Sequence, residues 1–317
     1  MKRAAKSLIF FIFCVLGIYI GIQTLDKSAL ANIINDIETR LSIPEPAPEI
    51  PVTYGENTED SLAKFTVIDV GQGSALLMQS DGECLLYDGG DNDASSVTVT
   101  VLKKAGVSRI RYIIASHYDS DHIGGIIAAL KNFEVDTLLL PTYEPEESRT
   151  YLSLQETIKE SGVNVVYPEP GEVYACGKAK IRIIGPLQSY EDENANSIAS
   201  IIETAGKKVY VGGDATAEAE EDMAKQFDVD VDVMLIDHHG SSTSSSMAFM
   251  REATPMFSII SCGKNNDYHH PTGKVLTTVK KYTEGLYRTD IQGDIVFHVT
   301  KTGLCFEQEP CNDYTPQ

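Results

Sequence analysis

Four side chains that can bind a metal ion lie within six positions of one another, directly after a run of apolar residues. In the stretch RYIIASHYDSDHIGG, residues 111–125, they are His117, Asp119, Asp121 and His122. Two carboxylates this close repel each other, and burying them costs free energy unless a cation lies between them. The spacing therefore predicts a metal centre at the end of a buried strand. The alternative interpretation is a polar loop of solvated charges.

Three further places combine a strand-like apolar run with polar, metal-capable residues at its end. Asp214 follows KKVYVGG, the adjacent His238 and His239 follow VDVMLID, and His270 lies beyond MFSIISCG. Sites on layered folds usually lie at strand ends, so we expect these side chains to meet the first group. Taken alone, Asp214 could instead cap a helix that begins near Thr216, and the histidine pair could be a surface turn.

The elements that must position these residues alternate along the chain from about Leu62. The pattern is rich in strands first and mixed afterwards, which favours two packed sheets with helices outside. We expect strands over residues 63–70, 75–80, 83–90, 110–116, 180–185, 197–206, 207–215, 231–236, 256–261, 294–300 and 304–308, and helices over 95–106, 150–162, 217–227 and 273–282.

The N-terminus has a basic start followed by an apolar run from Leu8 to Ile22. This run is typical of a signal-peptide core and is shorter than the ~20 residues that a spanning helix needs. We interpret residues 1–24 as a cleaved signal or an uncleaved membrane anchor, and residues 25–61 as a juxtamembrane helix and a Pro/Glu-rich linker. A folded domain over 62–310 and a tail over 311–317 follow. Either interpretation places the protein at the extracellular face of the cytoplasmic membrane or secretes it.

The formal net charge of −20 bears on the choice of partner. Nucleic-acid binders gain affinity by neutralising phosphates with Lys and Arg. Nucleic acid therefore stays open as a partner only through a local basic patch that the total charge hides.

Six fragments, taken in order, carry a pattern known from one family. They are VIDVGQGSALLMQSDGECLLYDGGDN, SHYDSDHIGG, NSIASIIETAGKKVYVGGDATAEAE, IDHHGSSTSSS, IISCGKNNDYHHPTGKVL and LYRTDIQGDI. From about Phe65 to Val299 the chain resembles the metallo-β-lactamase superfamily and, within it, the hydrolase domain of the competence protein ComEC. The resemblance implies an α/β (α+β) fold, a four-layer αββα sandwich. It also implies two divalent metal ions, Zn²⁺ or Mn²⁺, in a shallow groove.

The resemblance also divides the metal ligands into two sets that share a bridging aspartate. The expected sets are His117, Asp119 and Asp214 for one metal, and Asp121, His122, Asp214 and one of His238 and His239, with His239 favoured, for the other. A hydroxide shared by two cations about 3.5–4 Å apart is a nucleophile at neutral pH, and the metals also hold the oxyanion charge that develops.

The sequence departs from the superfamily pattern at several positions. Asp119 stands at the second histidine of H-x-H-x-D-H, and no histidine occurs between Ile123 and Asp237. We expect Asn196 to stand in for the missing third-motif histidine, with water completing the coordination. More oxygen ligands shift the preference from Zn²⁺ toward Mn²⁺, and β-lactam hydrolysis is not expected.

Other residues receive supporting roles. Beside Asp121 and Asn196, His270 is the expected catalytic residue, as a ligand or as the general acid for the leaving group. The side chains expected to bind substrate oxygens are Ser241, Lys264, Asn265 and Asn266. Asp69 and Asp88 are expected to brace the ligands from behind.

The leading hypothesis is an extracytoplasmic hydrolase with two metals, which cleaves phosphodiesters with a metal-bridging hydroxide. A DNA nuclease of the ComEC type and a cell-wall phosphorylcholine-type esterase are the alternative enzymes. A catalytically silent binding module on the same fold is the alternative of another class.

Overall fold

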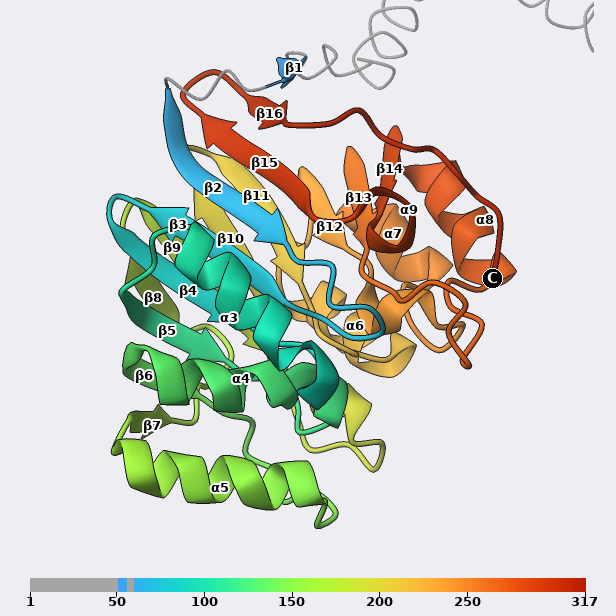
Figure 1. Ribbon diagram of the computed structural model, residues 1–317. Coiled ribbons are helices and arrows are strands. Elements are labelled where there is room, and N and C mark those ends of the chain that lie inside the picture. The colour runs from blue at the N-terminus through green and yellow to red at the C-terminus, as the bar shows by residue number, and fades with distance from the viewer. Residues whose placement is uncertain (1–50, 56–59) are drawn as a thin grey trace, which may run out of the picture. The chain divides into compact units, whose positions relative to one another are not determined.

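The computed structural model describes residues 51–55 and 60–317 (Figure 1). The predicted signal or anchor, residues 1–24, lies outside these residues, as does most of the predicted linker. Within the described ranges, every helix is too short or too polar to cross a bilayer.

Two β-sheets form the inner layers of the described domain. In strand order, the first sheet contains β1 (Val52–Tyr54), β16 (Leu304–Phe306), β15 (Ile295–Thr300), β2 (Ser61–Val67), β3 (Leu76–Ser80), β4 (Glu83–Tyr87), β5 (Arg109–Ile114), β6 (Glu134–Leu139) and β7 (Asn164–Val166). The second sheet contains β14 (Gly285–Arg288), β13 (Phe257–Ile260), β12 (Val233–Leu235), β11 (Lys207–Val211), β10 (Ala199–Thr204), β9 (Ala179–Gly185) and β8 (Val173–Cys176).

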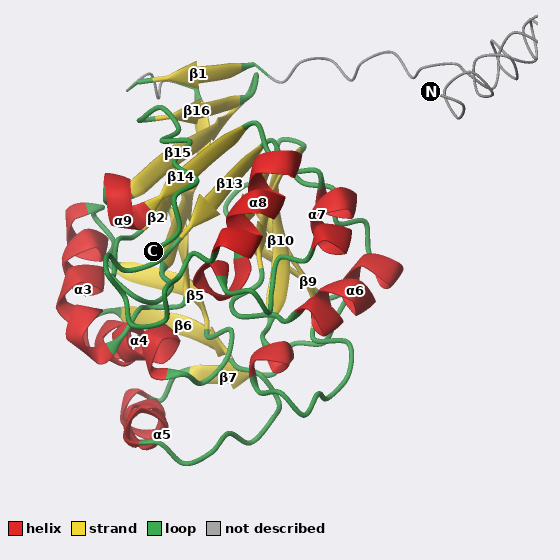
Figure 2. Cartoon of the chain, turned by 90° about the vertical axis from the view of Figure 1, so that its right-hand side faces the viewer, coloured by secondary structure: helices red, strands yellow, loops and turns green. Residues whose placement is uncertain are grey.

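Helices cover the outer faces of both sheets, as Figure 2 shows. On the side of the first sheet they are α3 (Ser95–Lys104), α4 (Ser120–Asn132) and α5 (Arg149–Ser161), and on the side of the second α6 (Ala217–Gln226), α7 (Met247–Ala253) and α8 (Gly273–Tyr282). A one-turn helix, α9 (Thr289–Gln292), follows β14. The predicted αββα sandwich is therefore confirmed.

Apolar side chains fill the spaces between these layers. One buried cluster lies among β4, β5, α3 and α4, and a second lies among β11–β13 and α6–α8. Aromatic rings pack on the inner face of the first sheet, where Phe65 stacks on Phe297 with ring centroids 4.8 Å apart. Such a pair contributes about 0.5–1.5 kcal/mol beyond the area it buries. The rigid layers fix the strand ends that carry the polar residues.

The structure differs from the predicted elements at both ends of the domain. Strand β1 lies in the segment predicted as a linker and pairs in parallel with β16. The predicted tail packs back on the domain, where Asn312 N donates to Leu286 O at 3.1 Å and Asn312 Oδ1 accepts from Leu286 N. Both segments are therefore part of the folded unit that the structure describes.

Helix α4 is absent from the predicted elements, because its two glycines lower helix propensity. A Cβ atom on Gly125 would lie 1.8 Å from Gly89 O, and one on Gly124 would lie 2.3 Å from Asn92 N. The glycines therefore let α4 press against the turn after β4. This approach brings the first turn of α4, with Asp121 and His122, to the strand ends.

Candidate metal centre

Seven side chains that the sequence predicts as metal ligands meet at the ends of strands from both sheets. They come from the loop after β5 with the start of α4, from the turn after β11, and from a short turn of helix, η3 (Asp237–Gly240), after β12. Among them are two groups whose ligand atoms lie within 4.8 Å of one another. These groups are His117, His122 and Asp214, and Asp121, His122 and His239.

Asp214 lies at the centre and presents one oxygen to each side. Its Oδ1 lies 3.2 Å from His122 Nε2 and 3.6 Å from His239 Nε2. Its Oδ2 lies 3.4 Å from His238 Nε2 and 3.9 Å from His117 Nε2. Asp214 Oδ1 and His117 Nε2 are buried without a hydrogen-bond partner among the described residues. The carboxylate is thus placed to bridge two ions.

The carboxylates of Asp119 and Asp121 lie on opposite sides of the cluster, each near different imidazoles. Asp119 Oδ2 lies 3.6 Å from His117 Nε2. Asp121 Oδ2 lies 3.2 Å from His239 Nε2 and 3.9 Å from His122 Nε2. The two sides of the cluster therefore each contain a terminal carboxylate besides the shared one.

Each of the four imidazoles has a partner at Nδ1, so that its Nε2 faces the cluster. These contacts join His117 to Ser116 Oγ at 3.0 Å, His122 to Asp88 Oδ2 at 2.8 Å, His238 to Thr243 Oγ1 at 3.1 Å and His239 to Ser261 O at 3.0 Å. A partner on the second ring nitrogen fixes the orientation of a metal-binding histidine.

The chemistry of this donor set fits divalent ions. A carboxylate and a backbone carbonyl only accept hydrogen bonds, so His122 and His239 donate at Nδ1 and carry a lone pair at Nε2 when neutral. Their Nε2 atoms lie 3.2 Å apart. Lone pairs at this distance repel unless a cation lies beside them. Imidazole nitrogen and carboxylate oxygen are ligands of both Zn²⁺ and Mn²⁺.

The electrostatics of the cluster also require positive charge. Burial raises the pKa of Asp214, but the charges on His122 and His239 outweigh burial and hold that pKa well below its ordinary value. Burial lowers the pKa of His122, and the surrounding carboxylates outweigh it and raise that pKa well above its ordinary value. Without metal the imidazole of His122 therefore holds a proton, and a bound divalent ion would replace it.

The side chain of Asn196, which was expected to substitute for a histidine, is bonded to its own loop. Its Oδ1 accepts from Tyr190 N at 2.9 Å, and its Nδ2 donates to Tyr190 O at 3.0 Å and Asp192 O at 2.9 Å. The amide is occupied in fixing its own loop. His238 faces Asp214 Oδ2, the oxygen that also faces His117.

Asp69 and Asp88 were predicted to brace the ligands. Of these two, Asp88 bonds a ligand directly, through His122 Nδ1. Asp88 Oδ1 also accepts from Ser116 N at 2.8 Å. Asp69 instead accepts from Gly71 N at 3.2 Å and shapes the glycine turn after β2. That turn supports the cluster through its backbone, because Ser74 N donates to the carbonyl of Asp121 at 3.1 Å.

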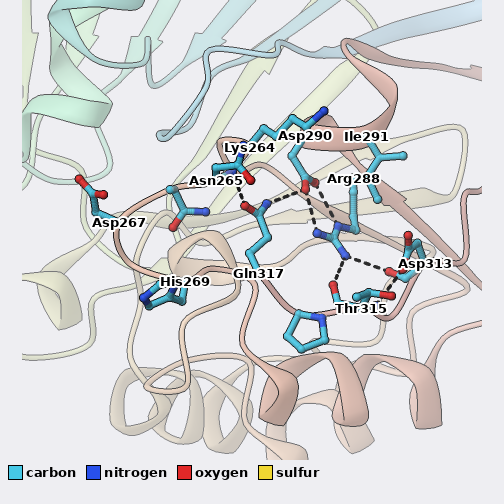
Figure 3. Close-up of a pocket in the computed structure, with 12 residues that line it drawn as sticks. Lys264, Asn265, Asp267, His269, Arg288, Asp290, Ile291, Asp313, Thr315 and Gln317 are labelled. Atoms are coloured by element: carbon cyan, nitrogen blue, oxygen red, sulfur yellow. Dashed lines mark hydrogen bonds and ion pairs between the residues drawn. The ribbon is translucent and has the colours of Figure 1, made fainter.

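The residues predicted to bind substrate have other partners. Ser241 Oγ lies 2.9 Å from Thr243 Oγ1, which orients His238. Asn266 bonds the backbone of its own loop. Lys264 and Asn265 line a cavity of about 660 Å³ on which Arg288 and Asp290 also lie (Figure 3). Substrate contacts at these positions stay predictions.

His270 lies beside the cluster with its ring centroid 5.7 Å from that of His238. Its side chain is buried, and Nδ1 has no hydrogen-bond partner among the described residues. Burial, together with the charges of His238 and His239, lowers the pKa of His270 to about 4. The ring is therefore neutral at neutral pH, when it offers one N–H donor and one acceptor rather than the acidic proton of an imidazolium.

A cavity of about 560 Å³ opens beside the cluster and includes Asp119 and Asp121 in its wall. The rest of the wall contains Tyr118, Ser120, Pro145, Glu146, Ser148, Asp192, Glu193, Asn194 and Tyr268. No lysine or arginine belongs to this set of lining residues. The cavity is thus the acidic approach to the candidate metal centre.

The sequence analysis missed three of the groups that bond the imidazoles at Nδ1 and so orient them. Ser116 directly precedes His117, and Thr243 follows the histidine pair closely, so polar neighbours of the ligands were a usable signal. The carbonyl of Ser261 had no such signal, because a backbone group carries no information in the residue type.

Comparisons with known proteins show which family and which relatives the chain is similar to. The profile described as Metallo-beta-lactamase superfamily matches residues 68–263. ComE operon protein 3 of Bacillus subtilis (strain 168) is 29% identical over 257 residues, which cover 75% of this chain and 33% of that protein. Competence protein ComA of Neisseria gonorrhoeae is 29% identical over 254 residues, 78% of this chain and 34% of that protein. The chain thus spans about a third of the length of these relatives.

Among solved structures, a variant of the CmlA beta-hydroxylase resembles the chain with a TM-score of 0.50. The two are 14% identical, and the match covers 87% of this chain and 60% of that one. At this level of identity the likeness shows the shared fold.

Proposed function

This chain belongs to the metallo-beta-lactamase superfamily, and we propose on this basis that it is a metal-dependent hydrolase that cleaves phosphodiesters with two bound ions. The observation that carries the proposal is the position of Asp214, whose two oxygens face different imidazoles at 3.2 and 3.4 Å. A carboxylate shared in this way favours a pair of ions over a single one. Ions held by Asp214 and the imidazoles around it would supply activation of a water molecule near neutral pH and stabilisation of negative charge.

The residues of the chain divide the remaining tasks. The carboxylates of Asp119, Asp121 and Asp214 would balance the positive charge of bound ions. Asp88 holds His122 in the tautomer that leaves Nε2 free. His270, neutral at pH 7, would hydrogen-bond a phosphoryl or leaving-group oxygen rather than protonate it as an imidazolium.

The acidic cavity favours one of the candidate substrates over the other. A DNA strand would bring consecutive phosphates against Glu146, Asp192 and Glu193, and no cation of the cavity wall would neutralise them. The proposed substrate is therefore a small phosphodiester with a neutral or cationic leaving group, which a cell-wall phosphorylcholine-type compound exemplifies. A nuclease of the ComEC type is the second candidate, which the likeness to two competence proteins favours.

A panel of substrates tests this proposal. The full chain, stripped of metal and reloaded with Mn²⁺ or Zn²⁺, is assayed with bis-p-nitrophenyl phosphate, p-nitrophenyl phosphorylcholine and single-stranded DNA. The proposal expects metal-dependent turnover of the small diesters and little of the DNA. Turnover of DNA at physiological salt would instead support the nuclease, and a metal-loaded protein that cleaves none of them would support the binding module.

The proposed location is outside the cytoplasm, with the N-terminal segment as signal or membrane anchor. The motivation is the basic start and the apolar run from Leu8 to Ile22. If the protein is anchored, protease added to intact cells should degrade the part that follows the anchor. If it is secreted, the protein should be present in the medium. A body that is protected until the cells are lysed would contradict this location.

A further inference from the structure

The loop that carries His270, residues 263–270, is held near its start by the side chain of Gln317. Gln317 Nε2 donates to Gly263 O at 3.0 Å, and Gln317 Oε1 accepts from Asn265 N at 2.5 Å. Figure 3 shows Gln317 between Asn265 of this loop and Asp290. The same amide therefore bonds the His270 loop on both of its polar atoms.

Gln317 is in turn fixed by a buried ion pair. Its Nε2 also donates to Asp290 Oδ2 at 2.6 Å. Arg288, which is 2% exposed, binds both oxygens of Asp290, from Nε at 3.0 Å and from Nη2 at 2.8 Å. Its Nη1 donates to Asp313 O at 3.1 Å and Thr315 O at 2.7 Å. The segment of residues 313–317 is thus tied to the second sheet at the end of β14.

The contacts continue from Gly263 to His270 itself. Asn266 Nδ2 donates to Gly263 O at 2.8 Å and to His270 O at 2.6 Å, and His270 N donates to Asn266 Oδ1 at 3.0 Å. Gly263 O accepts from both Asn266 and Gln317. A shift of Gly263 would therefore pass through Asn266 to the backbone of His270.

Few apolar contacts support the loop on the side that faces residues 313–317. The loop faces residues 313–317 and helix α9 across the cavity of about 660 Å³, and in its described wall only Ile291 and Pro316 are apolar. Hydrogen bonds across an open cavity, rather than buried apolar area, hold the loop here. Gly263 N also donates to Gln72 Oε1 at 3.2 Å. Loss of the Gln317 contacts would therefore loosen the start of the loop while the core stays intact.

We propose that Gln317 is a positioning residue: backed by the Arg288–Asp290 pair, it fixes the loop that holds His270 against the metal centre. The segment 313–317 then acts on the reaction from outside the site, without touching substrate. The kinetic part of this inference rests on the proposed function, and its structural part does not.

The kinetic test replaces the amide donor with a carboxylate. In Gln317→Glu, an ionised carboxylate oxygen would face Gly263 O and Asp290 Oδ2, so each contact would join two acceptors. We expect kcat to fall about tenfold or more at pH 8, the size expected for lost hydrogen bonds to a charged group. Protonating the new carboxyl restores one donor. Relative to the native protein at the same pH, the activity should therefore recover as the pH is lowered to about 5.5. Metal content and Tm should not change.

Gln308→Glu is the matched control, because it makes the same charge change in the same part of the chain. Gln308 Nε2 donates to Asp294 O at 3.1 Å and does not bond the His270 loop. This variant should keep the native kcat at both pH values. Equal losses in the two variants, or a loss in Gln317→Glu that does not recover at low pH, would overturn the inference.

Hydrogen exchange tests the structural part without any substrate. In Gln317→Ala, amide exchange in the peptide that contains residues 263–270 should rise at least about tenfold, as expected when local opening becomes easier by about 1.4 kcal/mol. Gln308→Ala should leave it unchanged. Unchanged exchange in Gln317→Ala, or a fall in Tm of the whole domain, would overturn the inference. If the native protein hydrolyses no phosphodiester but the exchange responds as expected, the proposed function fails and the positioning role stands.

Discussion

Asp88 accepts a hydrogen bond from His122 Nδ1 at 2.8 Å, and both side chains are fully buried. The pair fixes the tautomer of the imidazole that faces Asp214. In Asp88→Asn the amide can donate to Nδ1, which would place the proton on Nε2 and block it as a ligand. Metal affinity should fall about 10–100-fold, the usual cost of losing such a partner. Competition with a chelator measures it.

Asp69→Asn is the control for this change. Asp69 was predicted to brace the ligands as well, but its carboxylate bonds Gly71 N in the turn after β2. Its substitution should leave metal affinity close to native. Equal affinities of the two variants would contradict the role assigned to Asp88.

The pKa of His270 predicts how its removal changes the pH profile. Because burial and the nearby histidines lower that pKa to about 4, the ring is neutral from pH 6 to 8 and does not titrate there. His270→Asn should therefore lower kcat by a similar factor at every pH in this range. A variant that removes a limb of the profile between pH 6 and 8 would show that His270 titrates in the reaction.

Buried Glu220 predicts a pH dependence of stability. Burial raises its pKa above 4.5, against the backbone N–H groups of Ser246 and Ser245, which lower it. The folded state therefore binds this proton more tightly than the unfolded state. The resulting stability is fully present below the unfolded pKa and is lost as the pH rises through the folded pKa.

Glu220→Gln removes this titration. From pH 4.5 upward, the free energy of unfolding of the native protein should fall relative to that of the variant, as measured with urea at several pH values. Exposed Glu218 on the same helix supplies the control, since Glu218→Gln should leave the pH dependence native. A constant difference between native protein and Glu220→Gln at every pH would contradict the assignment.

The contact between α4 and the turn after β4 predicts a large effect of one methyl group. In Gly125→Ala the new Cβ atom would lie 1.8 Å from Gly89 O, so the backbone must move. We expect a loss of about 3 kcal/mol or more in the free energy of unfolding, together with weaker metal binding at Asp121 and His122. Gly273→Ala is the control, because the nearest atom to its Cβ is 3.9 Å away. Similar stabilities would contradict this close approach.

The sequence predicted those parts of the site that follow from periodicity and residue type. Apolar runs identified the strands that end at the site, β5, β11, β12 and β13, and missed β6, β7, β8 and β14 elsewhere in the sheets. The polar ends of the identified strands indicated Asp214 and the histidines, because ends of parallel strands meet in a layered fold. Periodicity and residue type could not decide which of His238 and His239 faces the metal centre. Both have positive φ, 52° and 55°, in a turn set by tertiary contacts, and this turn presents both rings to Asp214.

Asn196 shows which interactions a sequence pattern leaves out. Its position was inferred from a missing histidine, but its amide is bonded to the backbone of Tyr190 and Asp192. Such local bonds depend on the conformation of an irregular loop, which residue types do not specify. The role of Gln317 was missed for the same reason, since residues 311–317 have no periodic pattern that would dock them on the domain.

The central claim is that Asp214 joins two metal ions, and counting metal per chain tests it most directly. Purified full-length protein, equilibrated with Mn²⁺ or Zn²⁺ and freed of excess, should hold about two ions per chain, as expected for a bridged pair, and Asp214→Ala should lose both. Native protein that holds no metal, or Asp214→Ala that holds as much as the native protein, would contradict the account.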